Sequence, residues 1–254
     1  MRASIPERVA IVTGASEGIG LAISKRLSRS GAAVVLVSRR QSAVDDGAGA
    51  VEAAGGMALG VAADVRDREA VVAAVGKAIT EFGRLDVLVN NAGGSFGDTF
   101  NRGPLMDLSG EDLIEAYRLN VVGAFLCSQA AVPHLRKDGG GVIVNIGSIA
   151  GIRAPSGLAA YGASKAALAN LTRSMADEWA PEIRVCGVAA GFVDTSRVSG
   201  SRSPERLAKV LDSIALHRLG TTEDVASAVD YLASPAAAWN TGSILEIHGG
   251  QRTV

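Results

Sequence analysis

Short apolar segments alternate along the chain with longer segments whose apolar residues recur at helical spacing. The short segments are rich in Val, Ile, Leu and Ala and are predicted to be strands, at residues 8–13, 33–37, 57–62, 85–90, 141–147, 183–189 and 243–247. Strands that alternate with helices are typical of βαβ units and a mainly parallel sheet. The pattern therefore predicts an α/β fold, a Rossmann-type doubly wound sheet of seven strands with helices on both faces.

The predicted helices differ in length. The first begins near Gly18 and ends at Gly31, a residue suited to a left-handed C-terminal cap. Two longer helices, at about 109–135 and 157–180, flank the fifth strand. The least regular segment, 191–204, is predicted to be a mobile loop.

Composition and charge limit the classes of function. The chain has 254 residues, 48% of them hydrophobic, and no repeat or low-complexity linker, so we predict one domain over residues 1–254. A formal net charge of −1 without a basic stripe argues against a nucleic-acid partner. No apolar run approaches the roughly 18 residues of a membrane-spanning helix. The first residues do not resemble a signal peptide, so a cytoplasmic protein is expected.

The cysteines and histidines show no metal-ligand spacing. Cys127 lies in an apolar helical run and Cys186 in a predicted strand, and both are predicted to be buried apolar residues. His134, His217 and His248 are scattered along the chain. No metal site is predicted.

A glycine-rich turn joins the first strand to the first helix. It reads Thr-Gly-Ala-Ser-Glu-Gly-Ile-Gly, and its candidate binding residues are Gly14, Ser16, Glu17, Gly18, Ile19 and Gly20. Glycines let a ligand approach the backbone closely, and the N–H groups of a helix N-terminus favour negative charge. The turn is therefore a candidate site for the pyrophosphate of a dinucleotide. The alternative is a turn that serves packing alone.

The second strand is followed by basic residues. Ser38, Arg39 and Arg40 stand where a chain that binds NAD usually has a carboxylate for the ribose 2′-hydroxyl. A guanidinium there favours a 2′-phosphate, which predicts NADP(H) as the preferred cofactor and NAD(H) as the alternative. The acidic Glu17 in the first turn opposes this preference. Two solvated arginines are the other interpretation.

Three polar residues are candidates for catalysis. Tyr161 and Lys165 are four residues apart in a predicted helix and share one of its faces. Ser148 follows the fifth strand, at the sheet edge where open α/β sheets bind ligands. A ketone that accepts hydride needs a proton donor and a hydrogen-bonding group in place. The pKa of a free tyrosine is near 10, and a neighbouring lysine is expected to lower it.

These motifs together resemble the larger branch of the short-chain dehydrogenase/reductase family. The turn has the spacing G-x-x-x-G-x-G, and Asp64, Asn90-Asn91-Ala92-Gly93, Asn120, Ser148, Tyr161, Lys165 and a terminal stretch at 242–250 follow in the family's order. The resemblance covers nearly the whole chain. It implies an enzyme that transfers a hydride between a nicotinamide and a carbonyl or secondary alcohol.

The resemblance also implies roles for individual residues. Tyr161 is the acid/base, Ser148 stabilises the substrate oxygen, and Lys165 lowers the pKa of Tyr161 and binds the nicotinamide ribose. The backbone of Asn120 holds a water in a proton relay. The implied cofactor contacts beyond the turn are Asp64, Val65, Asn91, Ala92, Gly93, Gly191, Val193 and Thr195, with Ala190 where the family usually has proline. By itself, Asp64 is equally suited to cap the helix that starts near Asp67.

The substrate and the assembly are less defined by the sequence. Residues expected around the substrate are Ser95, Phe96, Ser148 and Arg153, with a loop at about 191–218. A 3-oxoacyl-thioester (acyl-carrier-protein) reductase and a hydroxysteroid dehydrogenase are the alternative activities. A non-catalytic NADP(H)-sensing protein is an alternative of another class, expected to lack Tyr161 or Lys165.

The resemblance further implies a homotetramer, or a homodimer, formed through the two long helices and the C-terminal segment. The small residues Ala163, Ala166, Ala167 and Asn170 suit a close approach of helices. They are equally compatible with packing inside one subunit.

Overall fold

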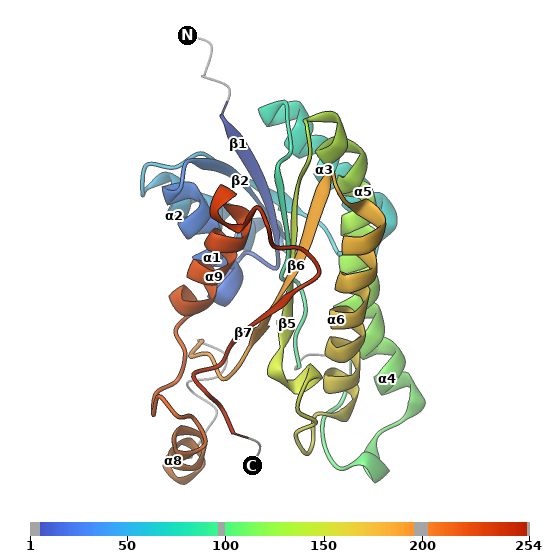
Figure 1. Cartoon of the computed structure of the whole chain (residues 1–254), viewed down its shortest axis with the longest axis vertical. Coiled ribbons are helices and arrows are strands. Elements are labelled where there is room, and N and C mark those ends of the chain that lie inside the picture. The colour runs from blue at the N-terminus through green and yellow to red at the C-terminus, as the bar shows by residue number, and fades with distance from the viewer. Residues whose placement is uncertain (1–5, 96–99, 196–202, 253–254) are drawn as a thin grey trace.

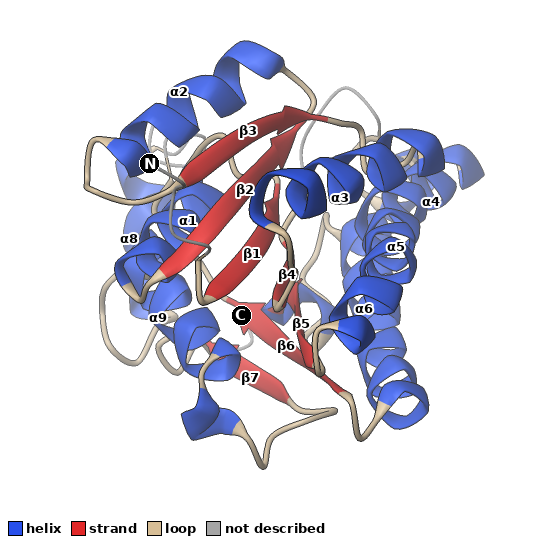
Figure 2. Ribbon diagram, turned by 90° about the horizontal axis from the view of Figure 1, so that it is seen from above, coloured by secondary structure: helices blue, strands red, loops and turns tan. Residues whose placement is uncertain are grey.

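The protein folds around one parallel sheet, seen from above in Figure 2. The computed structural model describes residues 6–95, 100–195 and 203–252. The strands lie in the order β3-β2-β1-β4-β5-β6-β7. Their bounds are β1 Arg8–Thr13, β2 Ala32–Ser38, β3 Ala58–Ala62, β4 Val87–Asn90, β5 Gly141–Ser148, β6 Ile183–Ala190 and β7 Ile244–Ile247. The predicted seven-stranded doubly wound fold is confirmed.

Helices cover both faces of the sheet (Figure 1). The α-helices of the described residues are α1 Gly18–Arg29, α2 Gln41–Glu52, α3 Arg68–Phe82, α4 Gly110–Tyr117, α5 Gly123–Lys137, α6 Ala159–Trp179, α8 Pro204–Asp212 and α9 Thr222–Ala233. Helices α1, α2 and α9 pack on one face, and α3, α5 and α6 on the other. Successive residues of β1 enter opposite cores, since Ala10 and Val12 face α1 while Ile11 faces α3. Burial on both faces explains the continuous apolar strands of the sequence.

The predicted helix at 109–135 is two helices joined by a wider turn. Helix α4 ends at Tyr117, a π-helical segment η2 runs over Arg118–Val122, and α5 continues from Gly123. Asn120 lies inside η2, and its amide donates to the carbonyl of Ala116 at 3.1 Å. The prediction of one regular helix was wrong here, because apolar spacing does not reveal an inserted residue.

Other predicted boundaries differ by small shifts. The strand predicted at 85–90 begins at Val87, and Leu85 lies outside it because its N–H donates to the side chain of Asp138 rather than to a neighbouring strand. Gly31 follows α1 with φ +90°, which confirms its left-handed conformation. Helix α8 occupies part of the predicted loop at 191–218, of which residues 196–202 lie outside the described part.

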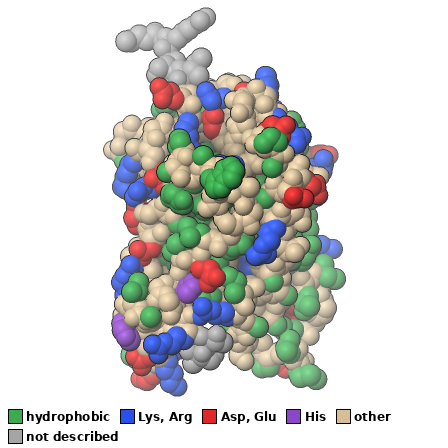
Figure 3. Space-filling view, in the orientation of Figure 1, with side chains coloured by type: hydrophobic (Ala, Val, Ile, Leu, Met, Phe, Trp, Pro, Cys, Tyr) green, Lys and Arg blue, Asp and Glu red, His purple; other side chains and the backbone are tan. Residues whose placement is uncertain are grey.

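Burial settles the prediction for the two cysteines. Cys127 and Cys186 are both buried, as predicted. Among the described residues, no helix is long and apolar enough to cross a membrane, and no three His, Cys, Asp or Glu side chains are grouped to hold a metal ion. On the described part of the face in Figure 3, basic and acidic side chains are interspersed.

A chain of polar side chains crosses the core between the sheet and two helices. The amide of Asn90 donates to Ser128 at 3.0 Å and to Asn145 at 2.9 Å. The amide of Asn145 in turn donates to Thr172 at 2.9 Å, and the Thr172 hydroxyl donates to the carbonyl of Leu168. All four side chains are buried. These bonds fix the positions of β4 and β5 relative to α5 and α6. Ser148 ends β5, and α6 carries Tyr161 and Lys165.

We expect Thr172→Val to lower the free energy of unfolding by about 1–3 kcal/mol, because it leaves the buried Asn145 amide without an acceptor. Thr80→Val is the matched control, since the Thr80 hydroxyl also donates to a carbonyl four residues back but is exposed. Chemical denaturation measures both variants. Equal losses in the two variants would show that the buried network contributes nothing of its own.

Candidate active site

The glycine-rich turn lies at the carboxyl end of β1 and opens directly into α1. Gly14 and Gly18 adopt φ values of +63° and +56°, which side chains other than glycine rarely adopt. A Cβ on Gly20 would overlap the carbonyl oxygen of Gly14. Glu17, the N-cap residue of α1, makes no side-chain capping bond. The N–H groups of the first helical turn are therefore available to an anion.

The end of β4 is clamped to this turn. The Thr13 hydroxyl accepts from the N–H groups of Asn91 and Ala92 at 3.1 and 3.0 Å. The amide of Asn91 donates to the carbonyls of Thr13 and Gly14 at 2.9 and 3.0 Å. The strand order reverses between β1 and β4, and open α/β sheets bind their ligands at such a switch point.

A cavity of about 690 Å³ lies at this switch point. It is lined by Gly14, Ser16, Glu17, Gly18, Ile19, Gly20, Val37, Ser38, Arg39, Arg40, Ala63, Asp64, Val65, Arg66, Asn91, Ala92, Gly93, Leu119 and Thr195. The set contains most of the predicted cofactor residues, and the volume is in the range of small-molecule and cofactor sites. A glycine-rich floor and basic residues at one end fit a phosphorylated dinucleotide.

Four lining residues, Val37, Ala63, Arg66 and Leu119, were missed by the sequence analysis. Arg66 follows Asp64 and Val65 in the turn between β3 and α3, and its place just beyond a strand end was the available signal. Leu119 is brought to the cavity by the π-helical segment. Asp64 does not cap α3, because that bond comes from Asp67, whose carboxylate accepts from the N–H groups of Glu69 and Ala70.

The structure places the predicted catalytic side chains beside one another. Ser148 ends β5, and its hydroxyl lies close enough to the phenol of Tyr161 on α6 to oppose a rise in the pKa of that phenol. The Nζ of Lys165 lies 5.8 Å from the centre of the Tyr161 ring and donates to the carbonyl of Ile146 at 2.8 Å. The segment after β5 packs closely against α6 because Gly151 and Gly162 have no side chains at the contact. A Cβ on Gly151 would lie 2.6 Å from the Lys165 backbone, and one on Gly162 would lie 2.8 Å from the Ala150 carbonyl oxygen.

Asn120 connects this group to the cavity. Its side-chain oxygen accepts from the N–H of Gly94 at 3.0 Å, and its amide donates to the Gly94 carbonyl at 3.3 Å. A Cβ on Gly93 would collide with Asn120 and lie 3.4 Å from the Nζ of Lys165. The turn that follows β4 therefore borders both the cavity and the lysine.

Burial is the largest influence on the two ionisable groups. It lowers the pKa of Lys165 to about 8. It also raises the pKa of Tyr161, and the nearby hydroxyl of Ser148 acts in the opposite direction. The lowering that we expected from Lys165 is therefore not the dominant effect on the phenol in this arrangement.

Other predicted residues are not among those that line the cavity or fall outside the described residues. Gly191 and Val193 do not line it; the N–H of Gly191 donates to β7, and Val193 bridges to Gly220. Ser95 and Arg153 are half-buried and do not line it either. Phe96 lies outside the described residues.

Comparison with known proteins supports the same assignment. The model of the short chain dehydrogenase family matches residues 8–206. The chain is 40% identical to cis-4-hydroxycyclohexanecarboxylate dehydrogenase of Sinomonas cyclohexanicum, over all of both chains, and 36% identical to 7alpha-hydroxysteroid dehydrogenase of Escherichia coli, over 96% of this chain and 93% of that one.

A solved structure also matches closely. It is a 7 alpha-hydroxysteroid dehydrogenase complexed with NADH and 7-oxo glycochenodeoxycholic acid, and it aligns with a TM-score of 0.91 at 35% identity over 98% of this chain and 96% of that one. The chain belongs to the short-chain dehydrogenase/reductase family of oxidoreductases, whose named relatives act on alcohol and ketone groups.

Proposed function

We propose that this chain is an NADP(H)-preferring oxidoreductase that interconverts a secondary alcohol and its ketone with the residues around Tyr161. The observation that carries the proposal is the grouping of Ser148, Tyr161 and Lys165 beside Gly93, which lines a cavity of dinucleotide size. A sensing protein that had lost catalysis is disfavoured by the presence and closeness of all three groups.

The chemistry follows from these positions. A nicotinamide bound in the cavity would supply the hydride to the carbonyl carbon in reduction and would accept it in oxidation. Tyr161 gives its phenolic proton to the substrate oxygen in reduction and takes a proton from the alcohol in oxidation. The Ser148 hydroxyl donates a hydrogen bond to the same oxygen, which stabilises its developing charge.

Lys165 stabilises the phenolate that Tyr161 forms when it gives up its proton. Because the pKa of Lys165 is near 8, the side chain is mostly protonated at neutral pH. Its charge acts at the 5.8 Å separation from the phenol ring. Asn120 fixes the turn beside the lysine, and we place the relay that returns a proton to Tyr161 along its backbone.

The preference for NADP(H) rests on the basic end of the cavity. Ser38, Arg39 and Arg40 all line it. Arg39 is also close enough to Asp64 for its charge to help lower the pKa of that carboxyl. Arg39 is the guanidinium that we assign to a 2′-phosphate, with Ser38 and Arg40 in support. Glu17 lines the same cavity and limits the preference.

The relatives point to a class of substrate. Two of them are named for oxidising a hydroxyl group on a saturated ring, in hydroxycyclohexanecarboxylate and in a hydroxysteroid. We therefore assign a ring-borne secondary alcohol or its ketone as the substrate class, in preference to a 3-oxoacyl thioester. Ser95 and Arg153 belong to the surroundings of this substrate in our proposal.

A homo-oligomer is part of the proposal. Ala163, Ala166 and Asn170 are exposed on α6, and Ala167 is half-buried. Helix α4 exposes nearly half of each of Leu113, Ile114 and Tyr117. Exposed apolar side chains beside a small-residue helix face favour burial against a second copy of the chain. A homotetramer is the assembly that we propose, with a homodimer as the smaller form.

The first test is Tyr161→Phe. We expect turnover of a cyclic ketone panel to fall by about 10²–10⁴-fold, because the proton donor is removed, while cofactor binding stays within twofold. NADPH absorbance measures turnover, and acyl thioesters and open-chain ketones complete the panel. Tyr231→Phe, at an exposed tyrosine of α9, is the control. A Tyr161→Phe variant that retains its turnover rate would refute the role of Tyr161. Tight binding of NADPH by the wild type without turnover of any substrate would favour the sensing protein.

Arg39→Leu tests the cofactor preference. We expect kcat/KM for NADPH to fall by about 10- to 100-fold with little change for NADH, because a charge-assisted contact with the 2′-phosphate contributes about 1.5–3 kcal/mol. Arg29→Leu removes an exposed arginine of α1 outside the cavity and is expected to change neither value. A wild-type preference for NADH would contradict the assignment.

Lys165→Met is expected to raise stability while it abolishes turnover. In the folded protein the pKa of Lys165 is about 8, below its ordinary 10.5, so the buried ammonium destabilises the fold at neutral pH. This penalty is complete below pH 8 and disappears as the pH rises to about 10.5. At pH 7 we expect the variant to be more stable by about 2 kcal/mol, after allowance for the lost bond to Ile146.

Chemical denaturation at pH 7 and at pH 10 measures this difference. The gap between Lys165→Met and the wild type should narrow at pH 10, where the wild-type lysine is neutral when folded. Lys77→Met, at an exposed lysine of α3, should show no such gap at either pH. A variant less stable than the wild type at pH 7 would show that the bond to Ile146 outweighs the cost of burying the charge.

A further inference from the structure

The segment that leads into α4 is anchored on both sides of Arg102. The buried carboxylate of Asp112 on α4 accepts from the backbone N–H and from the side-chain amide of Asn101, at 2.7 and 3.0 Å. On the other side of Arg102, the N–H of Gly103 donates to the carbonyl of Gly157 at 3.2 Å, just before α6. These bonds fix the backbone position from which the Arg102 side chain extends.

The same segment lies beside the phenol of the proposed reaction. Phe100 is 6% exposed and forms a small apolar cluster with Ala116 and Ala160, and Tyr161 packs against this cluster. Arg102 follows Phe100 by two residues and is exposed. Arg102 therefore stands near the reacting end of the site, while its side chain remains accessible to a ligand.

Helix α8 borders the same end of the molecule. Figure 1 shows α8 at the lower left and α4 at the lower right of this end. Thr195, which lines the cavity, precedes α8 along the chain. After α8, the N–H of Leu216 donates to the carbonyl of Gly249 at 3.1 Å, which ties the helix to the segment that follows β7. None of the residues of α8 is buried, so it is a surface helix attached next to the cavity.

Arg206, in the first turn of α8, brings a second positive charge to Arg102. Contacts that remove part of the solvent around the Arg102 guanidinium lower its pKa, and the charge of Arg206 lowers it further. Such an influence falls off with distance, so the two guanidinium groups lie near one another although their segments are far apart in the chain. Within the described parts of the chain no carboxylate pairs with Arg206, whereas Arg118 and Arg218 each hold one. The closeness of two like charges costs free energy unless an anion lies between them.

We propose that Arg102 and Arg206 form a subsite for a carboxylate of the substrate, away from the carbon that exchanges the hydride. A guanidinium binds a carboxylate through paired N–H donors, and two of them on separate segments can hold one carboxylate from two sides. The bound carboxylate also offsets the repulsion between the arginines. This inference rests on the function proposed above, and it narrows the substrate class to ring alcohols and ketones that carry a negative charge.

The test compares acids with their methyl esters. A series of cyclic ketones carries a carboxylate directly on the ring or on a short alkyl chain of increasing length, and the reduction of each acid and of its ester is followed by NADPH absorbance. NADH replaces NADPH if the wild type uses it better. The ratio of kcat/KM for the acid to kcat/KM for the ester measures recognition of the charge, and a loss of folded protein cancels in it. For at least one chain length we expect a wild-type ratio of about 10 or more, as one hydrogen bond to a charged group provides.

Variants of the two arginines should lower this ratio. Arg102→Met and Arg206→Met are each expected to lower it by about three- to tenfold, and the double variant should show no preference for the acid. Lys209→Met is the matched control, because it removes an exposed positive charge from the same helix. Its ratio should equal that of the wild type. An equal fall in Lys209→Met would show that the general charge of α8 attracts the acid, which would overturn the inference.

The remaining outcomes separate this inference from the proposed function. If the wild type reduces the esters as well as the acids at every chain length, the inference is overturned while the proposed function stands. A fall in only one arginine variant would assign the contact to that arginine and overturn the pair. If no ketone of the series is reduced, the proposed function and the inference fail together. A ratio that falls in both arginine variants and holds in Lys209→Met supports the carboxylate subsite.

Discussion

The site depends on the parallel alignment of β1, β4 and β5, whose carboxyl ends meet at one edge of the sheet. Because helices cover both faces, polar side chains gain access to a ligand only where the strands end. Thr13, Asn90 and Ser148 are the last residues of these three strands. The hydroxyl of Thr13 ties the ends of β1 and β4 together, and the side chains of Asn90 and Asn145 tie β4 to β5. Register between the strands therefore sets the distance from the cavity to Ser148.

The same arrangement carries a cost in stability. Lys165 is buried at 5% exposure, with one carbonyl as its hydrogen-bond acceptor in the described structure, and its pKa is lowered accordingly. Gly14 and Gly18 adopt backbone conformations that would be strained for residues with a side chain. Both features lie at the candidate site, and functional sites are where proteins commonly retain local instability. The surrounding sheet and its buried polar chain supply the stability that makes them tolerable.

Much of this arrangement was accessible from the sequence because it depends on periodicity and on the ends of strands. Apolar runs separated by helical spacing predicted the seven-stranded sheet, and the residues after β1, β2 and β5 predicted the cavity and the Ser148–Tyr161–Lys165 group. The four-residue spacing of Tyr161 and Lys165 placed them on one helical face, and Ser148 and the family resemblance gave the pair its significance.

What the sequence did not reveal depends on contacts between distant segments. The π-helical segment around Asn120 leaves no mark in the apolar spacing, so Leu119 was not placed at the cavity. The contact of Arg66 with Glu115 was out of reach, because the two residues are brought together only by the packing of α4. The direction of the shift in the pKa of Tyr161 was also out of reach, since it is set by burial rather than by the neighbouring lysine. Gly191 and Val193 were placed at the cavity by resemblance, whereas their backbone bonds direct them to β7 and Gly220.

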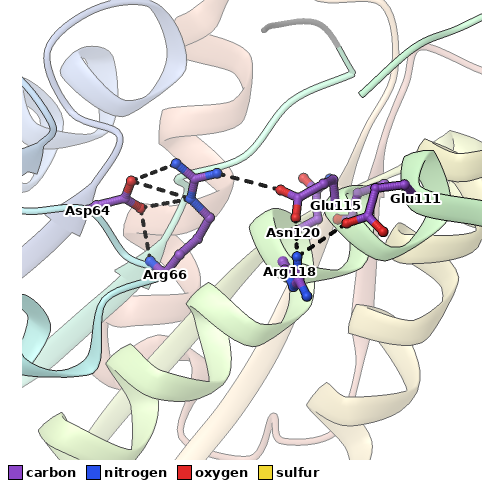
Figure 4. A network of polar contacts seen from close by, with 7 residues as sticks. Asp64, Arg66, Glu111, Glu115, Arg118 and Asn120 are labelled. Atoms are coloured by element: carbon purple, nitrogen blue, oxygen red, sulfur yellow. Dashed lines mark hydrogen bonds and ion pairs between the residues drawn. The ribbon is translucent and has the colours of Figure 1, made fainter. Parts of the chain in front are cut away.

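One helical stretch connects the two ends of the cavity. Glu115, in the last turn of α4, contacts Arg66 at the basic end, and Asn120, in the π-helical segment that follows, binds the backbone of Gly94 beside Lys165 (Figure 4). An uninterrupted α-helix from α4 into α5 would turn these two side chains differently relative to one another. The widened turn thus allows one element to hold the turn after β3 and the turn after β4 at once. Since both turns border the same cavity, a continuous helical segment rather than loops holds them relative to one another, which favours a fixed geometry between bound groups.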